Sequence, residues 1–156
     1  MSDRLEGLPR GVVLASALGL AVFFFLALTM LLGTPVLALN AYVQLIHFGA
    51  LILTFVAAIQ WGFGITASSR GLSIPAWWFP GTVFPVILAW LALAALNPIW
   101  RIFLLALGFG VVFVFDNISN SRGYAPTWYK RLRKILTIGV LGALCLALVA
   151  IRMSLS

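Results

Sequence analysis

The sequence is poor in charged residues, and above all in acidic ones. Of its 156 residues three are Asp or Glu, one is His and one is Cys, and charged residues of both signs make up 8%. A single cysteine excludes an intramolecular disulfide and a redox pair. So few carboxylate, imidazole and thiolate groups also argue against a metal site built from one chain. No metal and no catalytic residue is assigned, and we expect a protein that is not an enzyme.

Apolar residues dominate what remains. Hydrophobic residues make up 63% of the chain, too many for the available polar residues to cover a core in water. We therefore predict an all-α membrane protein in which five transmembrane helices form one compact bundle over residues 1–156. A membrane helix needs roughly 20 apolar residues. The expected helices cover residues 11–32, 42–67, 77–96, 99–115 and 135–151, and residues 116–134 form a basic, aromatic cytoplasmic link.

The basic residues predict the orientation of this bundle. With five spans, Arg101 and Arg152 fall on one side, and the other side holds Arg4, Arg10, Arg70, Arg122, Lys130, Arg131, Arg133 and Lys134. The positive-inside rule then places the N-terminus in the cytoplasm and the C-terminus outside. Anionic lipid is the expected partner of these cations, and nucleic acid is not. We expect a multi-pass protein of the bacterial plasma (inner) membrane, because acidic residues interrupt the N-terminal tail and transit peptides are poor in acids.

Polar residues recur along the second apolar stretch at steps of three or four, which places them on one helix face. We expect this face to point into the bundle, where its side chains either bond neighbouring helices or line a pocket. His47 could be a haem ligand if a symmetric dimer supplied a second one. The candidate stripe or pocket residues are Gln44, His47, Thr54, Gln60 and Trp61.

Asp116 is the one acidic residue outside the N-terminal tail, and it follows the fourth apolar stretch. A carboxylate at that depth is expected to pair with a cation on the same side of the membrane, and Arg70 and Arg133 are the candidates. The pair could simply fix the bundle, or it could belong to a site at the cytoplasmic mouth. The candidate ion-pair cluster is Arg70, Asp116, Asn117 and Arg133.

Aromatic and basic residues alternate just before the fifth apolar stretch, and two tryptophans open the third. Such residues are typical of the membrane–water interface, where rings lie among headgroups and cations contact phosphates. Recognition of a partner protein is the alternative use of this segment. The expected interface anchors are Trp77, Trp78, Trp128, Tyr129, Lys130, Arg131 and Lys134.

A resemblance to a known family covers nearly the whole chain. Gln60-Trp61-Gly62 ends the second stretch, and Pro126-Thr127-Trp128-Tyr129 leads into Leu132-Arg133 before the fifth. With Asp116, these motifs resemble the family of the domain of unknown function 3429, which is transmembrane protein 69-like. Gln60 departs from the family pattern, in which a basic residue is usual before Trp-Gly. The resemblance implies a membrane bundle and implies no activity.

Two classes of function fit the sequence. The first is an uncharacterised accessory or assembly subunit that docks on a larger membrane complex, respiratory or photosynthetic, and small residues four apart, such as Ala15 and Gly19, would also suit a homo-oligomer. The second is a binder or carrier of a small hydrophobic ligand within the bundle, such as a quinone, porphyrin or lipid. No cofactor is assigned, and haem and quinone both stay open.

Overall fold

The computed structural model describes residues 9–154 and shows an all-helical chain over that range. Its helices are α1 (Arg10–Leu32), α2 (Pro35–Ser69), α3 (Trp78–Ala94), α4 (Pro98–Ser121) and α5 (Thr127–Ser154). Proline occupies the first helical position of α2 and α4, where its missing N–H costs no hydrogen bond. Asn97 caps α4 by accepting a hydrogen bond from the backbone N–H of Ile99 at 2.9 Å.

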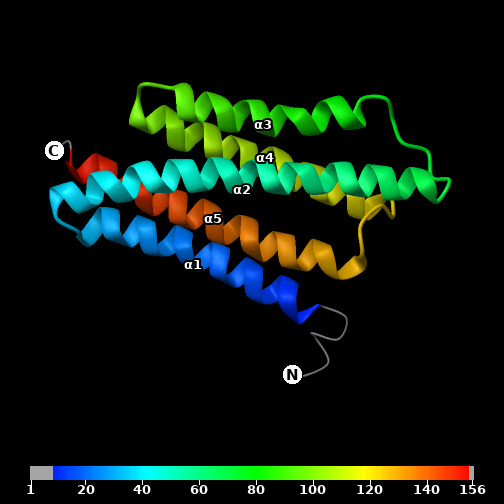
Figure 1. The fold of residues 1–156 in the computed structure, drawn as a ribbon, viewed down its shortest axis with the longest axis horizontal. Helices are drawn as coiled ribbons and strands as arrows, with labels where there is room; N and C mark the ends of the chain where they lie inside the picture. The colour runs from blue at the N-terminus through cyan, green and yellow to red at the C-terminus, as the bar shows by residue number, and fades with distance from the viewer. Residues whose placement is uncertain (1–8, 155–156) are drawn as a thin grey trace.

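The helices run alternately up and down, and they lie side by side in one bundle (Figure 1). α2 is the central helix and packs against α1, α3 and α4, while α5 packs against α1 and α4. Four of the helices, α1, α2, α4 and α5, are long and apolar enough to cross a membrane. α3 is apolar but has only 17 residues and contains Pro85.

The helices extend beyond the expected spans. α2 begins at Pro35 rather than near residue 42, α4 continues past Phe115 to Ser121, and α5 begins at Thr127 rather than near residue 135. Residues 116–134, expected as a link, are therefore mostly helical, and the turn between α4 and α5 covers only residues 122–126. Apolar content marks where the chain lies in hydrocarbon, whereas a helix can continue through its polar ends into the interface.

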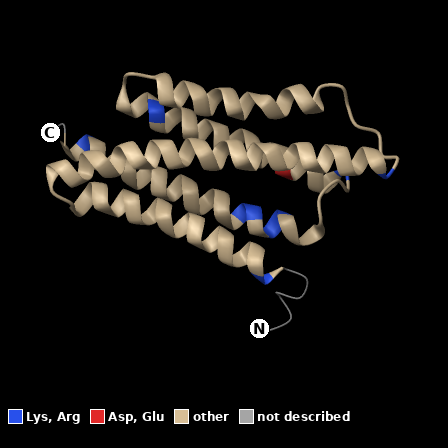
Figure 2. Ribbon diagram, viewed as in Figure 1, with Lys and Arg blue, Asp and Glu red and all other residues tan. Residues whose placement is uncertain are grey.

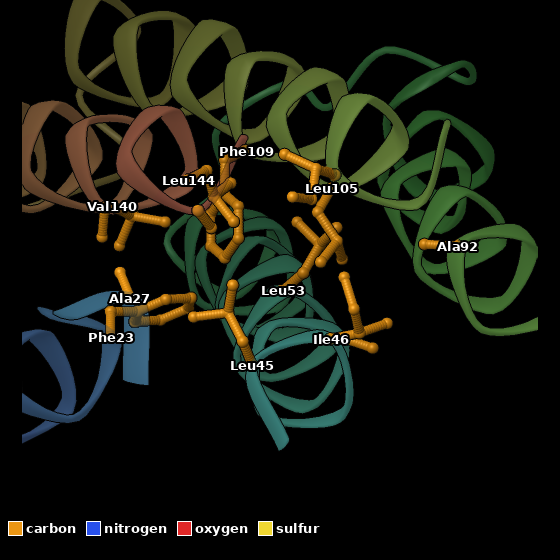
Figure 3. Packing of buried hydrophobic residues seen from close by; sticks show 14 of the residues in the cluster. Phe23, Ala27, Leu45, Ile46, Leu53, Ala92, Leu105, Phe109, Val140 and Leu144 are labelled. Atoms are coloured by element: carbon orange, nitrogen blue, oxygen red, sulfur yellow. The ribbon is translucent and has the colours of Figure 1, made fainter. Parts of the chain in front are cut away.

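Apolar side chains from all five helices form the core. Phe23 and Ala27 of α1, Leu45 and Leu53 of α2, Leu105 and Phe109 of α4, and Val140 and Leu144 of α5 meet in the middle, and Ala92 of α3 lies at its edge (Figure 3). The fully buried residues of α1 all lie in its second half, at Phe23, Ala27 and Met30, and Leu20 packs against the core from the turn before them. Toward its N-terminus α1 diverges from α2 (Figure 1).

Basic residues gather at one end of the bundle, which we call the basic end (Figure 2). This end holds the start of α1 with Arg10, the end of α2 with Arg70, the end of α4 and the first turns of α5. The opposite end carries Arg101 and Arg152. Arg4, which the sequence assigns to the same side as Arg10, lies outside the described residues.

Two turns are joined at the basic end. α2 and α4 both end with a glycine in the left-handed region, Gly71 at φ 76° and Gly123 at φ 70°, which is the usual way to stop a helix. Arg70 Nη2 donates to the carbonyl of Gly123 at 2.9 Å, and the hydroxyl of Tyr124 donates to the carbonyl of Ser73 at 2.6 Å. These bonds hold the α2–α3 and α4–α5 connections against each other.

Gly64 allows α3 to approach α2. A Cβ at position 64 would lie 2.8 Å from Nε1 and 2.9 Å from Cδ1 of Trp78, whose side chain is fully buried. The space that Gly64 leaves is therefore occupied by the indole of Trp78. Gly62, two residues earlier, has no atom within 4 Å of the equivalent position.

These two glycines give a matched test of this packing. We expect Gly64→Ala to destabilise the protein by about 1–3 kcal/mol, because the rigid indole of Trp78 must shift. Gly62→Ala should instead raise stability by up to about 1 kcal/mol, because alanine is the better helix former. Thermal unfolding in detergent, followed by circular dichroism, measures both changes. Equal effects of the two substitutions would contradict the close approach at Gly64.

Candidate functional site

Four polar side chains meet inside the bundle near its basic end, and we call them the buried polar cluster: Gln60, Asp116, Ser119 and Arg133. Arg133 Nε donates to Asp116 Oδ2 at 2.8 Å in a salt bridge. Gln60 Nε2 donates to Asp116 Oδ1 at 2.5 Å, and Ser119 Oγ donates to Gln60 Oε1 at 2.6 Å. Both carboxylate oxygens of Asp116 are thus bonded.

Three helices supply the cluster and a fourth supports it. Asp116 and Ser119 are three residues apart on α4, so they share a face toward Gln60 of α2. Arg133 reaches Asp116 from α5. Trp78 of α3 donates its indole N–H to the backbone carbonyl of Gln60 at 3.2 Å, in the space left by Gly64. α2, α3, α4 and α5 are therefore joined at one point.

The ion pair of this cluster is almost fully buried inside the protein. The side chains of Arg133 and Asp116 are 7% and 2% exposed. Taking two charges out of water costs several kcal/mol each, and their attraction offsets this only when further hydrogen bonds complete the site. Gln60 provides such a bond on the carboxylate side. The arginine side is incomplete.

Three buried donor atoms near the ion pair have no hydrogen-bond partner among the described residues. They are Nη2 of Arg133 and the hydroxyls of Tyr129 and Thr137, all on α5. The Tyr129 hydroxyl lies beside Asp116 and interacts with its carboxylate, so it is the least isolated of the three donors. An unpaired buried donor costs about 1–3 kcal/mol, more when it is charged. Tyr129, Arg133 and Thr137 follow one another at steps of four, so their donors share one face of α5.

This face of α5 opens on a cavity of about 520 Å³, which we call the wedge cavity. It lies where the first half of α1 diverges from α2, and α2, α4 and α5 supply its other walls. Gly19 and Ser16 line it on the α1 side. Most of the wall is apolar and much of it is aromatic, with rings from Phe23, Phe55, Phe63, Phe109, Trp128 and Tyr129. The three unpaired donors come from residues of the same wall: Tyr129, Arg133 and Thr137.

This arrangement suits binding rather than catalysis. Ligand pockets are commonly 300–1,000 Å³, mainly apolar, with a few convergent polar groups. Asp116 is bonded to Gln60 and Arg133 inside the bundle and does not line the wedge cavity, so it is not placed to take a proton from a molecule bound there. The wedge cavity is an apolar space, and the residues that carry the buried donors form one of its walls.

The polar stripe on α2 does not face the bundle interior, contrary to the expectation. Gln44, His47 and Trp61 are exposed on its outer face, and Thr54 is half-buried. His47 Nδ1 lies 2.7 Å from the carbonyl of Val43, and Thr54 donates to that of Leu51 at 2.8 Å, so both bond within their own helix. Gln60 belongs to the opposite face and is buried. A pocket built from the stripe and the tryptophans of α3 is therefore absent from the described residues.

The ion-pair cluster forms in part as expected. Asp116 pairs with Arg133, as one of the two predicted pairings requires. Arg70 instead bonds the carbonyl of Gly123, and Asn117 bonds that of Phe113 at 2.9 Å within α4. Gln60 joins Asp116, whereas Trp61, which is exposed on the outer face of α2, is not part of the cluster.

Two of the expected interface anchors are core residues. Trp78 is fully buried and Tyr129 is 6% exposed, with its ring edge-on to Phe63 at a centroid distance of 4.8 Å. Both rings are held by packing partners that the sequence pattern does not reveal. Trp77, Lys130, Arg131 and Lys134 are exposed, and Trp128 is half-buried in the wall of the wedge cavity.

Sequence reasoning missed Ser119 and Thr137. A signal for Ser119 was available, because it lies three residues after Asp116 and so shares its helix face. A signal for Thr137 was also available in the four-residue steps from Tyr129 through Arg133. Both signals depend on recognising that α4 and α5 continue as helices through residues 116–134.

Removal of the charge on Asp116 tests the cluster. We expect Asp116→Asn to lower the free energy of unfolding by about 3–5 kcal/mol, because Arg133 would keep a buried charge without its counterion. Arg70→Gln is the control. Because Arg70 is exposed, this substitution should lower the free energy of unfolding by less than about 1 kcal/mol. Thermal unfolding of detergent-solubilised protein measures both. Similar stability for Asp116→Asn and the unmodified chain would contradict the buried ion pair.

Comparison with known proteins agrees with this architecture. The model of a family described as "Protein of unknown function (DUF3429)" matches residues 8–150. Transmembrane protein 69 of Xenopus tropicalis is 35% identical over 95 residues, which cover 60% of this chain and 36% of that protein. The matched region is thus about a third of that relative's length, and no solved structure matches the chain. With its apolar helices, the chain is a multi-pass membrane protein, and it belongs to the DUF3429 family, which is transmembrane protein 69-like.

Proposed function

We propose that this protein binds a small hydrophobic ligand in the wedge cavity, as a carrier or receptor rather than an enzyme. The observation that carries the proposal is the coincidence of an apolar cavity with three buried donors that have no partner in the described chain. Buried donors are ordinarily paired in proteins. A ligand with an acceptor group would pair them, and its apolar part would fill the remaining space.

The position of the wedge cavity supports access from the membrane. It lies beside the first half of α1, whose residues 10–22 include none that are buried. A ligand dissolved in the hydrocarbon could therefore enter between α1 and its neighbours without passing through water. Displacing the first turns of α1 would disturb little packing, because its core contacts begin at Leu20 and its fully buried residues at Phe23.

We further propose that all five helices cross a bacterial inner membrane, with the basic end in the cytoplasm. The concentration of Arg and Lys at that end supports the orientation through the positive-inside rule (Figure 2). α3 would span ~26 Å at the usual rise per residue, slightly less than a typical hydrocarbon core. Local thinning of the bilayer or the flanking Trp77 would accommodate the difference.

A second candidate function is docking on a larger membrane complex, as an accessory or assembly subunit. The observation that favours it is the outward position of Gln44 and His47 on α2. Polar side chains are costly against lipid, so a partner's membrane helix with hydrogen-bonding side chains would suit this face better. A second copy of the chain would be an alternative occupant.

Filling the wedge cavity separates the two candidates. A Cβ at Gly19 would meet no atom within 4 Å, so Gly19→Leu should fold and occupy the cavity. We expect native mass spectra of the chain, extracted from its own membrane in mild detergent, to show a small-molecule adduct that Gly19→Leu loses. Gly62→Leu is the matched control, because Gly62 is equally open but lies on the outer face of α2, and it should keep the adduct.

Two other outcomes would contradict ligand binding in the wedge cavity. An adduct retained equally by both variants would place the molecule elsewhere. A bare chain, or a stoichiometric protein partner unaffected by Gly19→Leu, would favour docking instead.

The topology is testable with thiol labelling. In a Cys145→Ser background, we expect a cysteine at Leu96, which is 95% exposed between α3 and α4, to react with a membrane-impermeant maleimide in spheroplasts. A cysteine at Ser121, at the end of α4, should react only after the membrane is opened. Labelling of both positions from one side would show that α4 does not cross the membrane. Labelling of position 121 alone in spheroplasts would show that the orientation is the reverse of the one proposed.

A further inference from the structure

We infer that the ligand of the wedge cavity is a lipid-soluble molecule with a neutral carbonyl headgroup, of which an alkyl quinone is the membrane representative. This inference rests on the proposed function and specifies it. Its basis is the balance of donors, charges and rings around Arg133.

The donor set defines an acceptor headgroup. Nη2 of Arg133 can only donate, because a guanidinium has no acceptor atom. The hydroxyls of Tyr129 and Thr137 can donate as well; Nη2 of Arg133 and the Thr137 hydroxyl are buried with no partner in residues 9–154, and the Tyr129 hydroxyl lies beside Asp116. Their residues line one wall at four-residue steps of α5. A headgroup with oxygen lone pairs could accept hydrogen bonds from these donors. A headgroup that can only donate hydrogen bonds would leave Arg133 without a partner.

The charge balance favours a neutral headgroup over an anion. Asp116 already neutralises Arg133 through the 2.8 Å salt bridge, so the buried pair carries no net charge. A carboxylate or phosphate would add a second negative charge beside Asp116 in a low-dielectric interior. The remaining basic side chains of the first turns of α5, Lys130, Arg131 and Lys134, are exposed and do not line the cavity. A neutral carbonyl oxygen accepts from Arg133 without this penalty.

The rings of the wall favour a planar headgroup. Phe63 and Tyr129 are in edge-to-face contact at 4.8 Å, and Trp128 lies 6.0 Å from Tyr129. Phe23 and Phe109 complete the aromatic wall on the side away from the basic end. Flat rings pack against such surfaces by stacking or edge contacts. A quinone combines a flat ring, two neutral carbonyl acceptors and an apolar tail, which can leave the cavity beside α1 into the hydrocarbon.

The test compares headgroups on the full chain in phosphatidylcholine nanodiscs. The probes are decylubiquinone, its reduced quinol and dodecanoic acid, and quenching or change of tryptophan fluorescence reports binding, since Trp128 lines the cavity. We expect saturable binding of the quinone, weaker binding of the quinol and the weakest binding of the carboxylate at neutral pH.

Two variants distinguish a binding role from a structural one. Thr137→Val removes a hydroxyl that has no partner among the described residues, so stability should stay the same or rise. Tyr129→Phe also removes a hydroxyl beside Asp116, so this variant is compared by quinone affinity alone. Quinone affinity should fall about fivefold for each, as expected for one lost hydrogen bond, and at least tenfold for both together. Thr54→Val is the matched control, because its hydroxyl bonds Leu51 of its own helix and lies away from the cavity, and it should not change affinity.

The outcomes separate this inference from the proposed function. If dodecanoic acid binds more tightly than the quinone and both α5 variants weaken it, the wedge cavity is a ligand site and the neutral-carbonyl assignment is wrong. If quinone binding is the same in the unmodified chain and the double variant, the molecule binds elsewhere and the inference is overturned. If no probe binds and Gly19→Leu changes no adduct, the proposed function itself fails.

Discussion

The buried salt bridge between Asp116 and Arg133 is the interaction on which the rest of the structure depends. It joins α4 to α5, and through Gln60 and the indole of Trp78 it also fixes α2 and α3. α1 takes no part in this cluster, and its fully buried residues begin only at Phe23. The helix that is left out of the polar cluster is therefore the one that diverges, and its divergence creates the wedge cavity.

The same salt bridge determines the chemistry of that cavity. Arg133 uses Nε for Asp116, and within the described range of the chain its Nη2 atom has no partner, like the hydroxyl of Thr137 one turn further along α5. Because the pair is neutral as a whole, the nearby donors favour a neutral acceptor over an anion. If the cluster only stabilised the bundle, an arginine with all its donors bonded would be more stable. The unpaired donors are thus the feature that a purely structural account leaves unexplained.

Much of this could be predicted from the sequence, and the failures have physical causes. Apolar length located all five helices, and the scarcity of acids identified Asp116 as an ion-pair residue with Arg133 as one of two candidate partners. The orientation of the α2 stripe could not be predicted, because lipid and core are both apolar and periodicity does not say which face is inside. The burial of Trp78 depends on the space at Gly64, and that of Tyr129 on Phe63, and both are contacts between separate helices.

The most direct test of this account is a distance measurement between the guanidinium of Arg133 and a bound ligand. Solid-state NMR on ¹⁵N-arginine-labelled protein with decylubiquinone carrying ¹³C carbonyls can detect dipolar coupling between the two. A hydrogen bond of usual length predicts a carbonyl carbon within about 4 Å of an Arg133 nitrogen, with the coupling lost when Arg133 is replaced by Lys. Saturable quinone binding without any coupling to Arg133 would contradict the account.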